Sequence, residues 1–102
     1  MTILEMAETW AEQGRKLALA TVVETWGSAP QPTGSQLLVD SDGQFEGAVS
    51  GGCVEGEVIT QAQDVIATGL HKVLEFGVAD ETAWRAGLAC GGRIKIFVEA
   101  LN

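Results

Sequence analysis

The chain has 102 residues, of which 46% are apolar and 20% charged, proportions that are ordinary for one globular domain. Its formal net charge of −8 repels nucleic acid and anionic membrane surfaces, so neither is expected as a partner. No uninterrupted apolar run is long enough to cross a bilayer, and no basic segment followed by an apolar run opens the chain. We therefore expect a cytoplasmic protein with no membrane association.

The first half of the chain predicts one helix and three strands. Apolar residues recur at helical spacing over residues 3–14, where a glycine ends the pattern. Residues 17–26 are apolar or β-branched on both faces, which is typical of a central strand. Residues 36–50 have the pattern of a β-hairpin with its turn at 40–43, and the proline- and glycine-rich stretch before them predicts a loop.

The second half predicts another helix and two more strands. A helix is expected over 53–68, a short strand over 72–76, a single helical turn over 80–87 and an alternating strand over 93–101. The residues expected to face the core are Val54, Val58, Ala62, Val65 and Ile66 in the helix, and Ile94, Ile96 and Val98 in the last strand. Together these elements predict an α/β (α+β) fold in a single domain over residues 1–102. Two main helices would pack on a mixed sheet of about five strands.

The stretch Ser50–Glu55 carries the first candidate for chemistry. Two glycines precede Cys53 where a strand gives way to a helix, and the first N–H groups of a helix are open to an anion or a thiolate. The charges of Glu55 and Glu57 would oppose both. Glu55 would instead cap back onto the Gly52 N–H. The alternative is a tight turn whose cysteine is only a small buried residue.

A second cysteine has the reverse arrangement, because Cys90 is followed by Gly91 and Gly92. Cys53 and Cys90 are the only cysteines of the chain, and in the cytosol they are expected to be thiols. Two such loops favour one shared site, with the loop over 27–35 as another wall and Trp26 beside it. The alternative for Cys90 is again a glycine turn with a buried cysteine. Cys and His residues alone are too few for a closed zinc site, since the chain has one histidine, expected to be exposed.

Four stretches of the chain together resemble one family of proteins. They are GSAPQPTGSQLLV, GAVSGGCVEGEVI, EFGVADETAWRAGL and GLACGGRIKIFVE. Over residues 17–99 the chain resembles the N-terminal domain of the XdhC/CoxI family. The paired SGGCVE and GLxCGG motifs, in this order, carry the resemblance.

The resemblance implies a molybdenum-cofactor chaperone and not an enzyme. Members of the family serve xanthine and carbon monoxide dehydrogenases: they are thought to bind the cofactor, protect it during sulfuration by a cysteine desulfurase, and assist its insertion into the apoenzyme. The cofactor is a phosphate-bearing pterin that holds its metal through a dithiolene. The resemblance implies that the residues matching the family motifs bind the cofactor transiently: Gly27, Ser28, Pro30, Ser50, Gly51, Gly52, Cys53, Glu55, Cys90, Gly91 and Gly92. Among them, Cys53 and Cys90 would be ligands of molybdenum or of a transferable sulfur.

The chain departs from the family pattern at two places. Gln31 stands where many members have a basic residue, and no C-terminal Rossmann-like domain follows, as in short CoxI-like members. A separate family member or a homodimer would then complete the site. Two other hypotheses remain open from sequence: a thiol redox or sulfur-transfer protein that uses both cysteines, and an interaction subunit in which the glycines serve folding alone.

Overall fold

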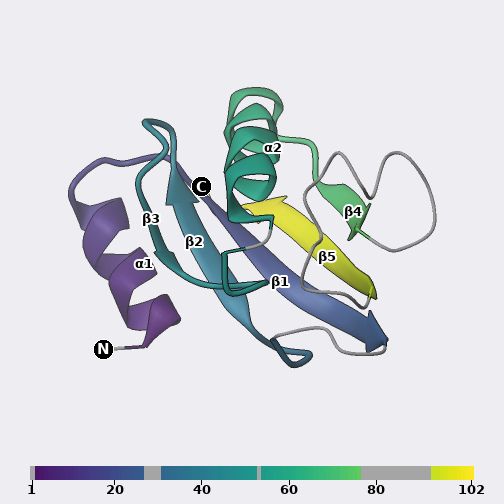
Figure 1. The fold of residues 1–102 in the computed structure, drawn as a ribbon. Coiled ribbons are helices and arrows are strands. Elements are labelled where there is room, and N and C mark those ends of the chain that lie inside the picture. The colour runs from purple at the N-terminus through teal and green to yellow at the C-terminus, as the bar shows by residue number, and fades with distance from the viewer. Residues whose placement is uncertain (1, 27–30, 53, 77–92) are drawn as a thin grey trace.

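The structure is a computed structural model that describes residues 2–26, 31–52, 54–76 and 93–102. These residues form two helices and five strands, which Figure 1 shows in chain order. The elements are α1 (Ile3–Glu12), β1 (Leu17–Trp26), β2 (Gln36–Asp40), β3 (Phe45–Gly47), α2 (Glu55–Thr68), β4 (Lys72–Phe76) and β5 (Arg93–Ala100). Each corresponds to an element expected from the sequence. The helical turn expected over 80–87 lies outside the described residues.

The five strands form one sheet in the order β3-β2-β1-β5-β4, so β1 is central as its two apolar faces predicted. The expected fold class, two helices on a sheet of five strands, is confirmed. In strand direction the sheet differs from the mixed one expected, because all four pairings among the described strands are antiparallel. Strand polarity depends on which strands become neighbours, and the alternation of side chains does not reveal this.

Helix α2 covers one face of the sheet. Its apolar stripe meets the inward-facing side chains of β1, β2 and β5, and Phe76 of β4 joins the same cluster. Every residue predicted for this core is buried except Ile66, which is partly buried at its margin. Removing these apolar side chains from water is the main favourable contribution to the fold.

Helix α1 lies against the opposite face of the sheet (Figure 1). Ala7 and Trp10 pack against Leu17 and Leu38, whose neighbours along each strand point to the α2 side. A capping box begins α1, since Thr2 and Glu5 exchange side-chain-to-backbone hydrogen bonds. The main contacts of α1 with the sheet are to β1 and β2, and Ile3 also lies close to Gly47 of β3, so α1 covers the β1, β2 and β3 side of this face.

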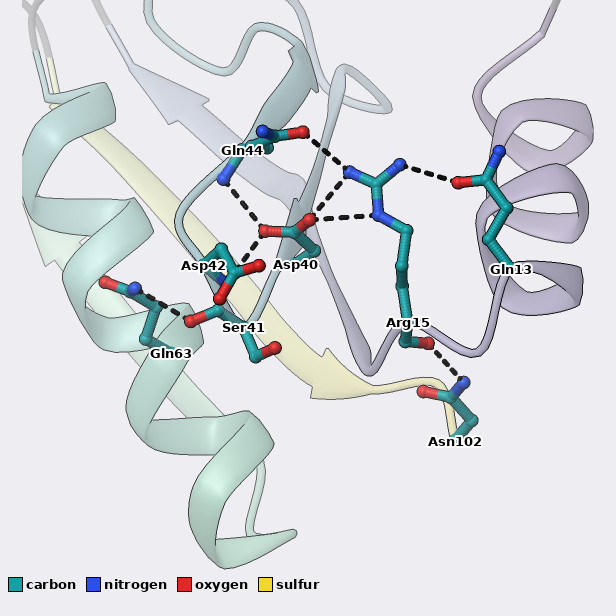
Figure 2. Close-up of polar contacts among 8 residues, drawn as sticks. All are labelled: Gln13, Arg15, Asp40, Ser41, Asp42, Gln44, Gln63 and Asn102. Atoms are coloured by element: carbon teal, nitrogen blue, oxygen red, sulfur yellow. Dashed lines mark hydrogen bonds and ion pairs between the residues drawn. The ribbon is translucent and has the colours of Figure 1, made fainter.

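A polar cluster around Arg15 and Asp40 fixes α1 to the sheet, as Figure 2 shows. Arg15 donates from Nε and Nη2 to Asp40 Oδ2 at 3.0 and 2.6 Å, and its guanidinium lies 3.6 Å from the centroid of the Trp10 ring. The other carboxylate oxygen of Asp40 accepts the N–H groups of Asp42 and Gln44, each at 2.9 Å. Burial would raise the pKa of Asp40, but the hydrogen bonds from Arg15 and the turn lower it overall. The cluster lies where β2 meets the hairpin turn, and its role is structural.

Within the described residues, no helix is both long and apolar enough to cross a membrane.

Candidate functional site

The turn between β3 and α2 is built from glycine. Gly51 and Gly52 have φ angles of 69° and 109°, in a region that side-chain-bearing residues rarely adopt. Val49 and Ser50 before them are buried, and α2 begins at Glu55. The sequence predicted this strand-turn-helix order. Cys53 itself lies outside the described residues.

A single carboxylate holds this turn together. Oε2 of Glu55 accepts the N–H groups of Val49 and Ser50 at 2.9 Å each, and Oε1 accepts the N–H of Gly52 at 2.8 Å. The Ser50 hydroxyl donates to Oε1 and in turn accepts the N–H of Val54 at 2.9 Å. The predicted capping of the Gly52 N–H by Glu55 is therefore confirmed, and the carboxylate binds two further N–H groups that the sequence did not reveal.

The hydrogen bonds keep Glu55 ionised although its side chain is buried. Burial alone would raise the pKa of Glu55, but the Ser50 hydroxyl and the N–H groups of Ser50, Val49 and Gly52 together lower it to about 2. The carboxylate is thus charged throughout the physiological pH range. Its main-chain donors are N–H groups of the turn before α2, and not the first N–H groups of the helix that the sequence offered to a ligand.

This changes how the turn can act chemically. The N–H groups of Val49, Ser50 and Gly52 donate to Glu55, so they are not open to the anionic part of a bound molecule. What the turn offers is a fixed path for the backbone on either side of residue 53. Buried hydrogen bonds to a charged group resist displacement, because breaking them leaves polar groups unsatisfied.

The strand ends bring the flanks of two of the three glycine-containing loops to one end of the sheet, and the glycine turn begins further along β1. Trp26, the last residue of β1, pairs with Arg93, the first residue of β5, and Phe76 at the end of β4 pairs with Ile94. On the other side of β1, the N–H of Ala48 donates to the carbonyl of Gln36, the first residue of β2. The loop over 27–35 and the segment over 77–92 therefore have flanks at this end of the sheet, whereas the turn over 48–54 starts beside Gln36, which pairs with Thr21, five residues before Trp26.

The flanks of the two cysteine loops also belong to one core. Val49 and Val54 border the turn that carries Cys53, and they lie in the same hydrophobic cluster as Phe76 and Ile94. Of the predicted site residues, the structure describes Ser50, Gly51, Gly52 and Glu55, which lie together in the turn. The others lie outside the described residues, and their roles remain predictions: Gly27, Ser28, Pro30, Cys53, Cys90, Gly91 and Gly92.

Trp26 and Arg93 form a pair at this end of the sheet, and the sequence indicated only the first of the two residues. The guanidinium of Arg93 lies 4.7 Å from the centroid of the Trp26 ring, and Arg93 also donates to Glu75 at 3.0 Å. Trp26 was a candidate wall of a pocket, whereas its pairing with Arg93 depends on a strand register that one sequence does not reveal. In the described ranges, no three His, Cys, Asp or Glu side chains gather in a way that could hold a metal ion.

Comparison with known proteins shows which family the sequence matches. A model of the XdhC and CoxI family matches residues 10–77, which include the glycine turn. The molybdenum cofactor insertion chaperone PaoD of Escherichia coli is 35% identical over 99% of this chain, and a probable xanthine dehydrogenase component of Bacillus subtilis is 30% identical over 95% of it. The chain spans 31% and 30% of the lengths of these two relatives.

A solved structure has the same fold. A crystal structure described as a xanthine dehydrogenase from Bacillus halodurans superposes with a TM-score of 0.81 at 29% identity. It covers all of this chain, which corresponds to 31% of the solved one. The fold described above is therefore the fold of one part of this longer solved chain.

Proposed function

Because the chain belongs to the XdhC and CoxI family, we propose that it is a molybdenum-cofactor-binding chaperone and not an enzyme. It receives the cofactor, holds it transiently during sulfuration by a cysteine desulfurase, and assists its insertion into a molybdenum hydroxylase of the xanthine or carbon monoxide dehydrogenase type. The likeness to the insertion chaperone PaoD over 99% of this chain supports the proposal.

The observation that carries the proposal is the Glu55 network. A buried, ionised carboxylate fixes the backbone at Val49, Ser50 and Gly52, directly before Cys53. By fixing the backbone before residue 53, this network would limit the positions open to the Cys53 thiol, and a transiently held metal requires a ligand of defined position. Glu55 and Ser50 are thus proposed to serve the cofactor by positioning the turn and not by contact.

The chain offers donors that fit the cofactor. The thiolates of Cys53 and Cys90 would hold the molybdenum or its sulfur, and the loop over 27–30 would add a wall. When bound, the cofactor supplies the redox-active metal that the hydroxylase needs. The chain's own residues hold it, orient it and keep it from water until transfer.

The proposed partners are macromolecules of the same maturation step in the cytoplasm. They are the hydroxylase apoenzyme, the cysteine desulfurase and a second polypeptide that completes the site, either a Rossmann-domain family member or another copy of this chain. Fourteen acidic residues against six basic ones give the chain an acidic surface, which favours a basic docking face on the partner enzyme.

The test is retention of the cofactor. Purified protein is mixed with molybdenum cofactor under anaerobic conditions and desalted, and bound molybdenum is measured by mass spectrometry. Wild type is expected to retain close to one equivalent, and Cys53→Ser and Cys90→Ser much less. Ser41→Ala, in the turn at the far end of the sheet, is the matched control and should retain as much as wild type.

Two results would count against the proposal. Equal retention by wild type and both cysteine variants would remove the thiols from the mechanism. No retention by wild type, with the fold intact by circular dichroism, would remove the chaperone function of this chain alone.

A further inference from the structure

We propose that Trp26 and Arg93 form the subsite for the organic part of the cofactor, with Trp26 stacking on the planar pterin and Arg93 binding its phosphate. The inference rests on the proposed function and deepens it, because the proposed cysteine ligands hold the metal and do not account for recognition of the pterin and its phosphate.

The two side chains lie together on the sheet face that α2 does not cover. Trp26 and Arg93 are directly paired across β1 and β5, and paired residues of antiparallel strands project to the same face. Ile94, the next residue after Arg93, is buried in the main core, so the side chains of Arg93 and its partner Trp26 point to the opposite face of the sheet. Trp26 is 40% exposed as a residue, so part of its surface is accessible to a flat ligand beside the Arg93 guanidinium.

A second Arg–Trp pair in the same molecule shows what a purely structural contact looks like here. Arg15 lies 3.6 Å from the ring centroid of Trp10, which is only 8% exposed in the α1 core. Arg15 is held by the buried carboxylate of Asp40 as well. That pair anchors a helix, and its ring has no surface left for a ligand.

Arg93 is held much less firmly than Arg15. Its guanidinium pairs with Glu75, and the two side chains are 50% and 47% exposed. Exposed ion pairs of this kind contribute little to stability, so a phosphate could replace Glu75 at small cost. Arg is suited to both tasks, since its planar guanidinium binds phosphate in a bidentate manner and stacks on aromatic rings.

The position along the chain connects this subsite to the proposed metal ligands. Arg93 follows Cys90 by three residues, so their Cα atoms are at most about 11 Å apart in any conformation. Trp26 directly precedes Gly27, the first residue of the predicted loop. Both side chains of the subsite therefore border segments that carry predicted site residues: Arg93 borders the segment with Cys90, and Trp26 borders the loop with Gly27.

Equilibrium dialysis of two metal-free probes tests this subsite: a pterin phosphate and its dephosphorylated form. Trp26→Leu is expected to weaken binding of both probes about tenfold, because aromatic stacking on a planar base is lost. Trp26→Phe should stay within about threefold of wild type. Arg93→Gln should weaken binding of the phosphorylated probe about tenfold and leave the other unchanged. Phe45→Ala, an exposed aromatic at the far end of β3, is the control and should bind as wild type.

The outcomes separate this inference from the proposed function. If wild type retains molybdenum cofactor but Trp26→Leu and Arg93→Gln bind both probes as wild type does, the subsite is wrong and the chaperone function stands. The same holds if wild type retains the cofactor but binds neither probe. If wild type does not retain the cofactor, the proposed function fails and this inference fails with it. If Trp26→Leu does not fold, Arg93→Gln tests the subsite by itself. Weaker binding of the phosphorylated probe, with unchanged binding of the dephosphorylated one, would support the subsite, and unchanged binding of both would exclude it.

Discussion

Glu55 closes back on Ser50 through both oxygens of its carboxylate. Oε2 accepts the Ser50 N–H at 2.9 Å, and the Ser50 hydroxyl donates to Oε1. The pair lies five residues apart on either side of the two glycines and Cys53. The partners of this buried carboxylate are almost all main-chain N–H groups. The carboxylate therefore stabilises the backbone conformation of the turn and does not act mainly on its side chains.

Replacing Glu55 by Gln should destabilise the protein by about 2 kcal/mol, because an amide cannot accept from all the donors that the carboxylate satisfies. Glu57→Gln is the matched control. It changes another acidic residue in the first turn of α2, but Glu57 is exposed and contacts only Gln61 in the described structure. Urea unfolding followed by circular dichroism measures both, and Glu57→Gln should lie within about 0.5 kcal/mol of wild type. Equal losses in the two variants would contradict the account of the turn.

The same residue should make stability depend on pH in acid. The pKa of Glu55 falls from 4.5 to about 2 on folding, so its contribution is complete above pH 4.5 and disappears as the pH falls toward 2. That contribution is about 3 kcal/mol at most. Between pH 5 and pH 3, wild type should therefore lose more unfolding free energy than Glu55→Gln does. Asp40, whose pKa is also lowered, adds a loss of the same sign to both proteins. Parallel pH curves for the two would show that Glu55 is not the group responsible.

Asp40→Asn should cost about 3 kcal/mol, since it leaves the guanidinium of Arg15 without its buried counter-charge. Asp42→Asn changes the exposed neighbour, whose N–H group donates to Asp40 and is kept in the variant. It should be close to neutral in the same unfolding experiment. A large effect of Asp42→Asn, or a small one of Asp40→Asn, would mean that the cluster in Figure 2 does not anchor α1.

Two glycines with the same φ angle make it possible to separate the steric clash of an added Cβ from the conformational strain of a positive φ. Gly34 and Gly47 both have a φ of 96°. A Cβ on Gly34 would meet open space, whereas one on Gly47 would overlap the carbonyl oxygen of Gln36. Gly34→Ala should therefore cost only the conformational strain, about 1 kcal/mol. Gly47→Ala should cost at least twice as much and should loosen the start of the glycine turn. Similar melting temperatures for the two variants would exclude the close approach of β3 to β2.

Local patterns in the sequence predicted much of the fold. The two-sided apolar character of residues 17–26 predicted the central strand, and the helical stripe over 53–68 predicted the core face of α2. The hydrogen bond from the Gly52 N–H to Glu55 was also predictable, because the two residues are only three apart in the sequence.

Contacts between distant segments could not be predicted in this way. Arg15 and Asp40 are separated by 25 residues, and Trp26 meets Arg93 only because β1 and β5 pair in one particular register. The direction of the strands has the same origin, which is why an antiparallel sheet stands where a mixed one was expected. At the candidate site, the sequence predicted that the first N–H groups of the helix are open to an anion, but it did not reveal that Glu55 binds the N–H groups of Val49 and Ser50 before the helix.

If Cys53 and Cys90 hold one cofactor, the bound cofactor should shield both thiols from alkylation. The rate of alkylation is measured by peptide mass spectrometry with and without bound molybdenum cofactor. We expect the cofactor to slow the modification of both cysteines at least tenfold, and Cys53→Ser to abolish the protection of Cys90. Unchanged alkylation of both thiols in protein that has retained the cofactor would show that they do not hold it.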